Sequence, residues 1–348
     1  MHKKTKKSVI AFSILALFTG VMITGIFIVF DRFSRIPEFG HQKDCGVVEY
    51  PAIREASGIA ASRRNGKVLW THNDSGHGPV LYAMNDQGRH LGLFRIAGAQ
   101  ARDWEDIAIG PGPQDGKDYI YIGDIGDNPR RRAYVTIYRV LEPEVSSSQK
   151  PVKVRLRDVE EIRLKLPDKP RDSEALMVDP LNKDIYIVTK RERKVAVYRS
   201  EYPQSTGEKI NEFQSVARLN LTDVVAADIS PSGLEVLIKT YSGVYYWRRD
   251  PDLSFAEMFK TRPVALPYIL EPQGEAICWS ADGNGYFTLS EELARVPAHL
   301  YFYPKVKSDY VEMNRTKQSA TSELLKYRIN FALHKAWKLS YILSTKFL

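Results

Sequence analysis

Acidic side chains recur at similar points of successive hydrophobic segments in this sequence. Carboxylates that lie within a few ångströms of one another repel, and they stay ionised together only when cations compensate their charge. A hard cation with about six to eight oxygen ligands suits such a set better than zinc or copper does. The sequence therefore predicts a calcium site, provided that the fold brings the recurrent residues together. With one short loop included, the predicted ligands are Glu105, Asp124, Asp127, Asn128, Glu174, Asp228 and Glu275.

Two arginines stand close to this acidic set and extend its chemistry. Arg102 and Arg171 each precede a glutamate of the set by three residues. A guanidinium group can hold a phosphate or a carboxylate through two parallel hydrogen bonds. Calcium and arginine together suit the hydrolysis of phosphate esters, because the cation polarises the ester and helps to ionise a water molecule. The predicted ligand is a small anionic substrate, bound by Arg102, Arg171, Asn73 and Asp74.

Candidate catalytic groups come from the same segments. Glu105 or Glu174 would act as the general base, and His72 would transfer a proton. A structural interpretation stays open, in which the acidic residues cap hairpins or form salt bridges with the two arginines and the histidine only packs. The sequence lacks the signatures of the common serine hydrolases, zinc proteases and nucleotide-binding loops.

The elements that must position these residues form a fivefold repeat. Each repeat contains short strands rich in β-branched and aromatic residues, separated by turns that use Asn-Gly, Asp-Gly, Pro and Ser. Four strands in a repeat of about 40–50 residues is the pattern of a β-propeller blade. The chain is therefore predicted to be an all-β propeller of about five blades over residues 44–304. The repeats span 57–96, 105–166, 174–221, 227–249 and 275–304.

Blade number and ring closure depend on the less regular segments. The fifth repeat lacks a fourth strand, which residues 46–50 could supply by pairing the two ends of the propeller. The stretches 141–158 and 201–215 could contain further strands, so six blades are the alternative. Cys45 would then lie near the outermost strand of a blade and Cys278 on its innermost strand, roughly three strand spacings of 4.8 Å apart. No disulfide is expected over that distance.

The repeat also predicts where the chemistry collects. The first two strands of a blade run antiparallel, so the first strand starts where the second one ends. Since the first strands surround the central axis of a propeller, carboxylates from several blades should converge at one end of that axis.

Five phrases of the sequence resemble a known family. They are THNDSG (71–76), RDWEDIAIGPG (102–112), YIGDIGDN (121–128), DSEALMVDP (172–180) and EPQGEAI (271–277). They are similar to blade motifs of bacterial secreted propellers of the phytase-like, esterase-like group, and the resemblance covers roughly residues 50–304. It implies a calcium-dependent propeller that hydrolyses phosphate or other esters.

The N-terminal end predicts a membrane anchor. Residues 8–30, from Ser8 to Phe30, form an uncharged apolar run that is long enough to span a bilayer as a helix. Four lysines within residues 1–7 place that end in the cytoplasm by the positive-inside rule. A linker of residues 31–43 then leads to an extracytoplasmic propeller, in the periplasm or at the cell surface. Cleavage as a signal peptide is the competing interpretation.

The C-terminal end is a basic tail. Residues 305–348 carry nine Lys/Arg against three Asp/Glu. Apolar residues recur there every three or four positions, which predicts an amphipathic helix on the membrane surface or against the propeller. The net charge of +8 lies mainly in the two tails, so we expect attraction to anionic lipid and not to nucleic acid.

Two classes of function agree with these features. In the first, the propeller is a calcium-dependent hydrolase of phosphate or related esters. In the second, it is a non-catalytic propeller that binds a surface ligand or a protein, and its acidic residues only hold a structural ion.

Overall fold

The computed structural model describes residues 37–293 and 296–306. The predicted cytoplasmic tail (1–7), membrane-spanning helix (8–30) and C-terminal amphipathic helix lie outside these residues. Within the described ranges, no helix combines the length and the apolar character needed to cross a bilayer.

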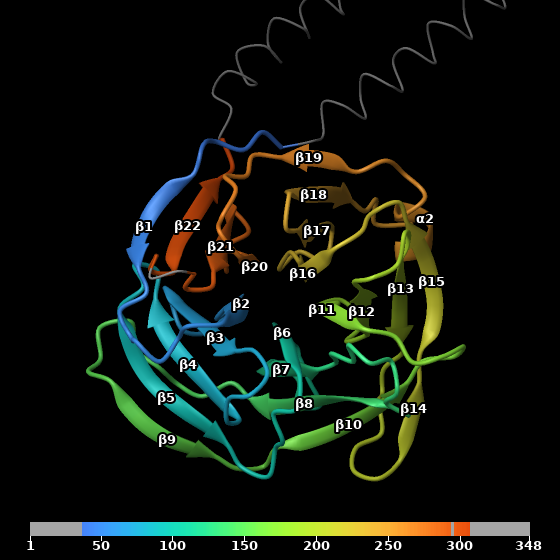
Figure 1. The fold of residues 1–348 in the computed structure, drawn as a ribbon, viewed down its shortest axis with the longest axis horizontal. Coiled ribbons are helices and arrows are strands. Elements are labelled where there is room, and N and C mark those ends of the chain that lie inside the picture. The colour runs from blue at the N-terminus through green and yellow to red at the C-terminus, as the bar shows by residue number, and fades with distance from the viewer. Residues whose placement is uncertain (1–36, 294–295, 307–348) are drawn as a thin grey trace, which may run out of the picture. The chain divides into compact units, whose positions relative to one another are not determined.

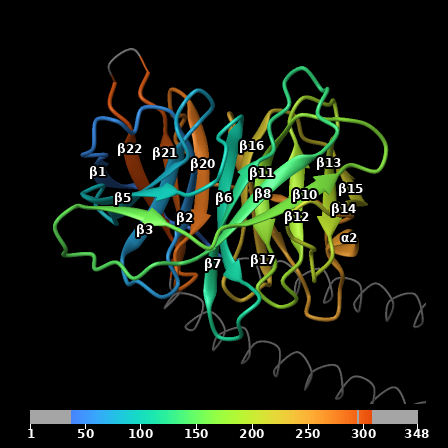
Figure 2. The same ribbon diagram turned by 90° about the horizontal axis from the view of Figure 1, so that it is seen from below.

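Five β-sheets surround a central axis (Figure 1). Each sheet is one blade, and the blades are numbered by the chain order of their innermost strands. The predicted five-bladed all-β propeller is therefore confirmed, and the alternative of six blades is wrong. Seen from the side, the innermost strands run through the molecule in the same direction (Figure 2).

Blades 1 and 2 each contain five strands. From the axis outward, blade 1 consists of β2 (Ala56–Ala61), β3 (Val68–Asn73), β4 (Val80–Asn85), β5 (His90–Ile96) and β9 (Val152–Leu156). Blade 2 consists of β6 (Trp104–Pro111), β7 (Asp118–Asp124), β8 (Val135–Leu141), β10 (Glu160–Lys165) and β14 (Ile210–Glu212).

The other three blades contain four strands each. Blade 3 consists of β11 (Ser173–Val178), β12 (Ile185–Thr189), β13 (Val195–Ser200) and β15 (Gln214–Leu219). Blade 4 consists of β16 (Val224–Ile229), β17 (Glu235–Thr240), β18 (Gly243–Arg248) and β19 (Val264–Leu266), with the short helix α2 (Phe255–Met258) before its last strand. Blade 5 consists of β20 (Gly274–Trp279), β21 (Gly285–Ser290), β22 (His299–Pro304) and β1 (Lys43–Val47).

The irregular stretches 141–158 and 201–215 were the basis of the six-bladed alternative. They do contain strands, but these strands extend existing blades. The strand β9 pairs in parallel with β5 at the outer edge of blade 1, and β14 pairs in parallel with β10 at the edge of blade 2. Each chain segment therefore returns along an open sheet edge and satisfies its backbone groups there.

Ring closure occurs as expected, but the closing strand begins earlier in the sequence than predicted. The strand β1 pairs antiparallel with β22, so the two chain ends share blade 5. The closing strand covers Lys43–Val47, three residues earlier than the predicted 46–50. In the order β1-β22-β21-β20, Cys45 is on the outermost strand and Cys278 on the innermost one, and both cysteines are free as predicted.

The hydrophobic core lies between neighbouring blades. Trp70 and Phe94 of blade 1 pack in one cluster with Ile120 of blade 2. Tyr246 of blade 4 likewise packs against Trp279 of blade 5, with their ring centroids 6.3 Å apart. Strands that are covered on both faces become almost continuously apolar, as the sequence of β12 illustrates. Burial between the blades therefore holds the inner strands at fixed positions around the axis.

Every innermost strand carries a β-bulge at its second residue. In β6, Trp104 pairs with Asp124 and Asp106 pairs with Gly123, which leaves Glu105 without a partner in the ladder. An extra residue of this kind bends the strand and redirects its side chain. The same shift occurs in the other four blades, and the bulged residues are Ser57, Glu105, Glu174, Val225 and Glu275.

The residue that follows one of these bulges ties three blades together. Asp106 is buried, and its Oδ1 accepts a hydrogen bond from the amide of Ile107 at 2.8 Å. Its Oδ2 accepts hydrogen bonds from the amides of Leu176 in blade 3 and Ala227 in blade 4, at 2.9 and 3.3 Å. Asp106 thus satisfies backbone groups of inner strands that are far apart in the sequence.

We predict that Asp106→Ala lowers the free energy of unfolding by about 2–5 kcal/mol, because it leaves buried amide groups of two other blades without an acceptor. Urea denaturation of the full chain measures the change. The control is Asp115→Ala, since the Asp115 side chain is 97% exposed and should contribute under about 0.5 kcal/mol. A loss for Asp106→Ala as small as that of the control would contradict this role.

Candidate cation site at the propeller mouth

The inner strands begin at one end of the axis, which we call the mouth. Glu105, Glu174 and Glu275 occupy the bulge position of β6, β11 and β20, so their side chains come from equivalent points of three blades. The second strands β3, β12, β17 and β21 end at the mouth, because their last residues pair with the first residues of the inner strands. The residues that follow these strand ends are Asp74, Lys190, Tyr241 and Glu291.

Seven carboxylates gather at the mouth in three overlapping groups. Within each group, one oxygen of every residue lies within 4.8 Å of the others. Glu105 belongs to two of the groups and Asp74 also belongs to two, so the groups join into one arc. The arc runs from blade 5 through blades 1 and 2 to blade 3. The groups are Asp74, Glu275 and Glu291; Asp74, Asp103 and Glu105; and Glu105, Asp172 and Glu174.

Two further side chains close the arc into a ring. The Lys190 ammonium lies 3.0 Å from Glu174 Oε1 and donates a hydrogen bond to the Tyr241 hydroxyl at 3.1 Å. The Tyr241 hydroxyl in turn donates to Glu275 Oε1. Blade 4 contributes only this tyrosine, because its bulge residue is Val225. We call the seven carboxylates with Lys190 and Tyr241 the acidic ring.

The acidic ring has a strong excess of negative charge. Burial, followed by the neighbouring Glu174, raises the pKa of Glu105 well above its usual range. Burial raises the pKa of Glu174 to about 7, and burial together with Glu275 raises the pKa of Glu291 to about 8. Burial and the charges of Asp74 and Asp172 raise the pKa of Asp103 to about 6. Glu105, Glu174 and Glu291 therefore retain protons near neutral pH unless a cation compensates them.

Cations of the protein compensate only part of this charge. Burial opposes the charged form of Lys190, but Glu174 and Glu275 outweigh it and raise its pKa. Arg191 Nε lies 2.5 Å from Asp172 Oδ2. Within the part of the chain that the structure describes, these are the ion pairs made by the seven carboxylates. Hard oxygen ligands in this number and spacing match the preference of Ca²⁺.

One glycine allows the ring to form at blade 2. A Cβ at Gly126 would stand 2.2 Å from Glu105 Oε1 and 2.5 Å from Asp103 Oδ2. Any larger residue would push both carboxylates away from the loop. Gly126 is therefore part of the site, because only a residue without a side chain leaves room for both carboxylates.

The structure brings four of the predicted site residues together. Glu105, Glu174, Glu275 and Asp74 all belong to the acidic ring. The predicted ligand loop, which contains Asp124, Asp127 and Asn128, is not part of the ring. Asp124 binds Arg132 at 2.8 Å, Asp127 accepts hydrogen bonds from the amides of Arg131 and Arg132, and Asn128 accepts one from Arg191. These residues shape the loop beside the ring, and their own oxygens are already engaged.

Asp228 also lies elsewhere than predicted. The first strand of blade 4 begins at Val224 and not at residue 227, so Asp228 is its fifth residue and lies deeper along the axis. Its Oδ2 accepts a hydrogen bond from the amide of Trp279 at 2.8 Å, near the end of β20. Asp228 lines a small cavity with Arg63 at the end of the axis opposite the mouth. It is not a member of the acidic ring.

The predicted proton-transfer and substrate groups have structural partners. His72 is buried with its ring against Trp104, and burial lowers its pKa to about 4, so it stays neutral. The Asn73 side chain accepts hydrogen bonds from the amides of residues 54 and 55. Arg102 is exposed and bonds Gln100, while Arg171 forms ion pairs with Asp168 and Glu192. None of these four belongs to the acidic ring.

Five members of the acidic ring lie outside the predicted sets of ligand, substrate and catalytic residues. A signal for two of them was present, since Asp103 and Asp172 each stand two residues before a ring glutamate in the repeated phrase Arg-Asp-x-Glu. The prediction used the arginine of this phrase, whereas in the structure its aspartate belongs to the ring. The other three, Lys190, Tyr241 and Glu291, occupy one equivalent position after the second strand. Their types differ from blade to blade, so only the register of the blades identifies them.

Comparisons with known proteins leave the family open. No protein-family profile matches the chain, and no curated protein does. Among solved structures, the chain is similar to Kuenenia stuttgartiensis hydrazine synthase, with 14% identity, a TM-score of 0.39 and coverage of 73% of this chain and 72% of that one. It is also similar to the WD40 repeats of RRP9, with 11% identity, a TM-score of 0.36 and coverage of 72% and 79%. Likeness at this level carries no argument about function.

The raised pKa values predict how stability depends on pH. A carboxyl group whose pKa is higher in the folded state stabilises that state below its unfolded pKa, and this contribution is lost as pH rises through the folded pKa. Because Glu174 and Glu291 have pKa values of about 7 and 8, the melting temperature in EDTA should fall between pH 5 and pH 8.5. Added Ca²⁺ should reverse most of the fall.

Differential scanning fluorimetry of the full chain at several pH values tests this expectation. The double variant Glu174→Gln/Glu291→Gln is the matched comparison, and its melting temperature in EDTA should change less with pH. A wild-type profile that is flat over this range, or one that Ca²⁺ leaves unchanged at pH 8.5, would refute the electrostatic description of the ring.

Proposed function

We propose that this protein is a calcium-dependent propeller that binds an anionic ester, such as a phosphate ester, at its mouth and hydrolyses it. The observation that carries the proposal is the acidic ring itself, in which seven carboxylates from four blades face one another. Such a concentration of negative charge suits a hard divalent cation. Glu105, Glu174, Glu275 and Asp74 are the expected centre of the ligand set.

The ring also contains groups suited to proton transfer. When bound, the cation supplies polarisation of the ester and a lowered pKa for a nearby water. Glu291, with a pKa of about 8, exchanges protons near neutral pH and is the best candidate for a general acid or base. Lys190 and Tyr241 are the hydrogen-bond donors among the ring side chains and can orient an anionic oxygen of the ligand.

The family resemblance supports the same proposal. The phrases that resemble phytase-like and esterase-like propellers contain Asp74, Asp103, Glu105, Asp172, Glu174 and Glu275. All six belong to the acidic ring. The phrases thus coincide with the residues that the fold gathers, although they lie far apart in the sequence.

Location is part of the proposal. Gly40 donates to the carbonyl of Pro304 and Phe39 bridges Lys305, so the chain enters and leaves the propeller side by side. Phe39 also packs against Trp279, the last residue of β20, at the end of the axis opposite the mouth. The proposal is that Ser8–Phe30 spans a membrane, that the basic residues 305–348 contact anionic lipid, and that the propeller lies outside the cytoplasm. Nucleic acid is not among the proposed partners.

A non-catalytic binding propeller is the second candidate. It is favoured by the contacts that the ring side chains make with one another. The pair Glu105–Glu174 and the pair Glu275–Glu291 are each joined by a hydrogen bond, and Lys190 neutralises one further charge. In that case the ring would be a structural device, and the ligand would be bound by the surrounding loops.

Calcium binding is predicted to depend on Glu105 and Glu174, which belong to the same group of the ring. Glu105→Gln and Glu174→Gln each remove one charged ligand and should weaken Ca²⁺ binding at least tenfold at pH 8, measured by isothermal titration calorimetry. The control is Glu144→Gln, because this side chain is 84% exposed in another part of the molecule. Unchanged affinity in both ring variants would contradict the proposed site.

Hydrolysis is predicted to require both the cation and Glu291. With 4-nitrophenyl phosphate as the probe, Ca²⁺ should support turnover, EDTA should abolish it, and Glu291→Gln should reduce kcat about 10²-fold while Ca²⁺ affinity falls far less. Glu144→Gln again serves as the control. If the protein binds Ca²⁺ but hydrolyses no ester in a panel of phosphate and carboxylate esters, the enzyme proposal fails and the binding propeller remains.

A further inference from the structure

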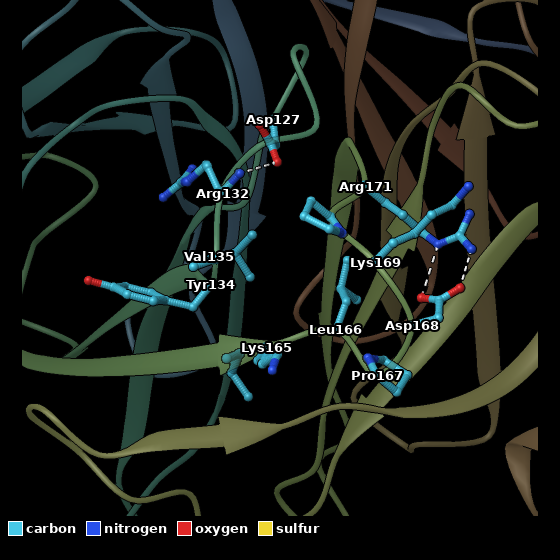
Figure 3. A pocket seen from close by; sticks show the side chains of 13 residues that line it. Asp127, Arg132, Tyr134, Val135, Lys165, Leu166, Pro167, Asp168, Lys169 and Arg171 are labelled. Atoms are coloured by element: carbon cyan, nitrogen blue, oxygen red, sulfur yellow. Dashed lines mark hydrogen bonds and ion pairs between the residues drawn. The ribbon is translucent and has the colours of Figure 1, made fainter.

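A cavity of about 220 Å³ lies beside blade 2, next to the loop that contains Asp127 (Figure 3). One wall is the segment 132–135, which leads into β8, and the other is the segment 164–171, which leaves β10. An apolar cavity of about 150 Å³ is already enough to bind benzene. The space is large enough for one six-membered ring with a small substituent.

The inner surface of the cavity is apolar. Val135 and Leu166, both buried, lie on opposite sides of it in Figure 3. Leu164, Pro167 and Pro170 add to the same surface. Two facing apolar walls favour a flat hydrocarbon group between them, because such a group removes apolar area on both of its faces from water.

The remaining lining residues are mainly basic. Arg171 is held by Asp168 and Glu192, so its guanidinium is a fixed part of the wall. Lys165 and Lys169 are exposed, and among the described residues neither ammonium has an ion-pair partner. Asp127, the other acidic lining residue, accepts the amide hydrogens of residues 131 and 132. Among the described lining residues, Lys165 and Lys169 are therefore the cations left without a carboxylate partner, while Arg132 is paired with Asp124 and Asp127 keeps its own charge.

We propose that this cavity binds a small organic anion with one flat apolar group. Val135 and Leu166 enclose the apolar group, while Lys165 and Lys169 bind the phosphate, phosphonate or carboxylate head. The cavity is separated from the acidic ring by the Asp127 loop, whose amide donates to Asp172 at 2.9 Å. The proposal does not depend on Ca²⁺ binding or on catalysis.

Phenylphosphonate and methylphosphonate are the probes that test it. Both are titrated into the full-length protein by calorimetry in EDTA, so no ring-bound cation contributes. Phenylphosphonate should bind at least tenfold more tightly, because only its ring fills the apolar space. The double variant Lys165→Ala/Lys169→Ala should weaken its binding at least fivefold. The control Lys153→Ala, an exposed lysine on β9 of blade 1, should leave the affinity unchanged.

A variant that fills the cavity provides the second arm. Leu166→Trp should abolish phenylphosphonate binding while the melting temperature stays within a few degrees of the wild type. If that variant unfolds, the lysine variants still decide, since both lysines are exposed. Equal affinity for the two phosphonates, no detectable binding, or unchanged affinity in the double lysine variant would overturn the proposal. None of these outcomes bears on Ca²⁺ binding by the ring.

Discussion

The β-bulge at the second residue of each innermost strand is the constraint on which the mouth depends. In a regular antiparallel ladder, successive side chains alternate between the two faces of the blade and pack against the neighbouring blades. The bulge removes one residue from that alternation, so its side chain is free to turn toward the mouth while the next residue returns to the ladder. Three of the five bulges carry a glutamate, and these glutamates belong to the acidic ring. Asp106 directly follows one of them and links the inner strands of three blades through its hydrogen bonds.

The charge of the ring and the burial of the blades act against each other. Packing between blades fixes the inner strands, and it thereby holds carboxyl groups closer than they would settle in water. The protein responds in two ways: protons are retained by Glu105, Glu174 and Glu291, and Lys190 is kept charged by its acidic neighbours. An ion that binds only the folded ring would stabilise the propeller and create an electrophilic centre at its mouth.

Much of the fold could be predicted from the sequence, because strand alternation and turn residues are local signals. Five repeats, ring closure by the N-terminal strand and two free cysteines all followed from them. The exact start of each strand was harder to predict. The first strand of blade 4 reads VVAADI, and its small residues hid its true start, so Asp228 was assigned to the mouth although it lies near the opposite end. The loop with Asp124 and Asp127 lies outside the ring for another reason. Side chains that ligate cations also accept hydrogen bonds from backbone amides and pair with arginine. Only the folded structure shows which of these partners each side chain has. Glu291, by contrast, has no neighbouring motif, and it joins the ring only through the equivalence of the blades.

Binding of a divalent cation by the acidic ring is tested most directly by an anomalous difference map. Crystals of the protein grown with Ca²⁺ at pH 8 should show a peak within the ring, at about 2.3–2.6 Å from oxygens of Glu105, Glu174 or their partners Asp74 and Glu275. A peak confined to Asp228 or to the Asp127 loop, or no peak in a map that resolves the ring side chains, would contradict the account.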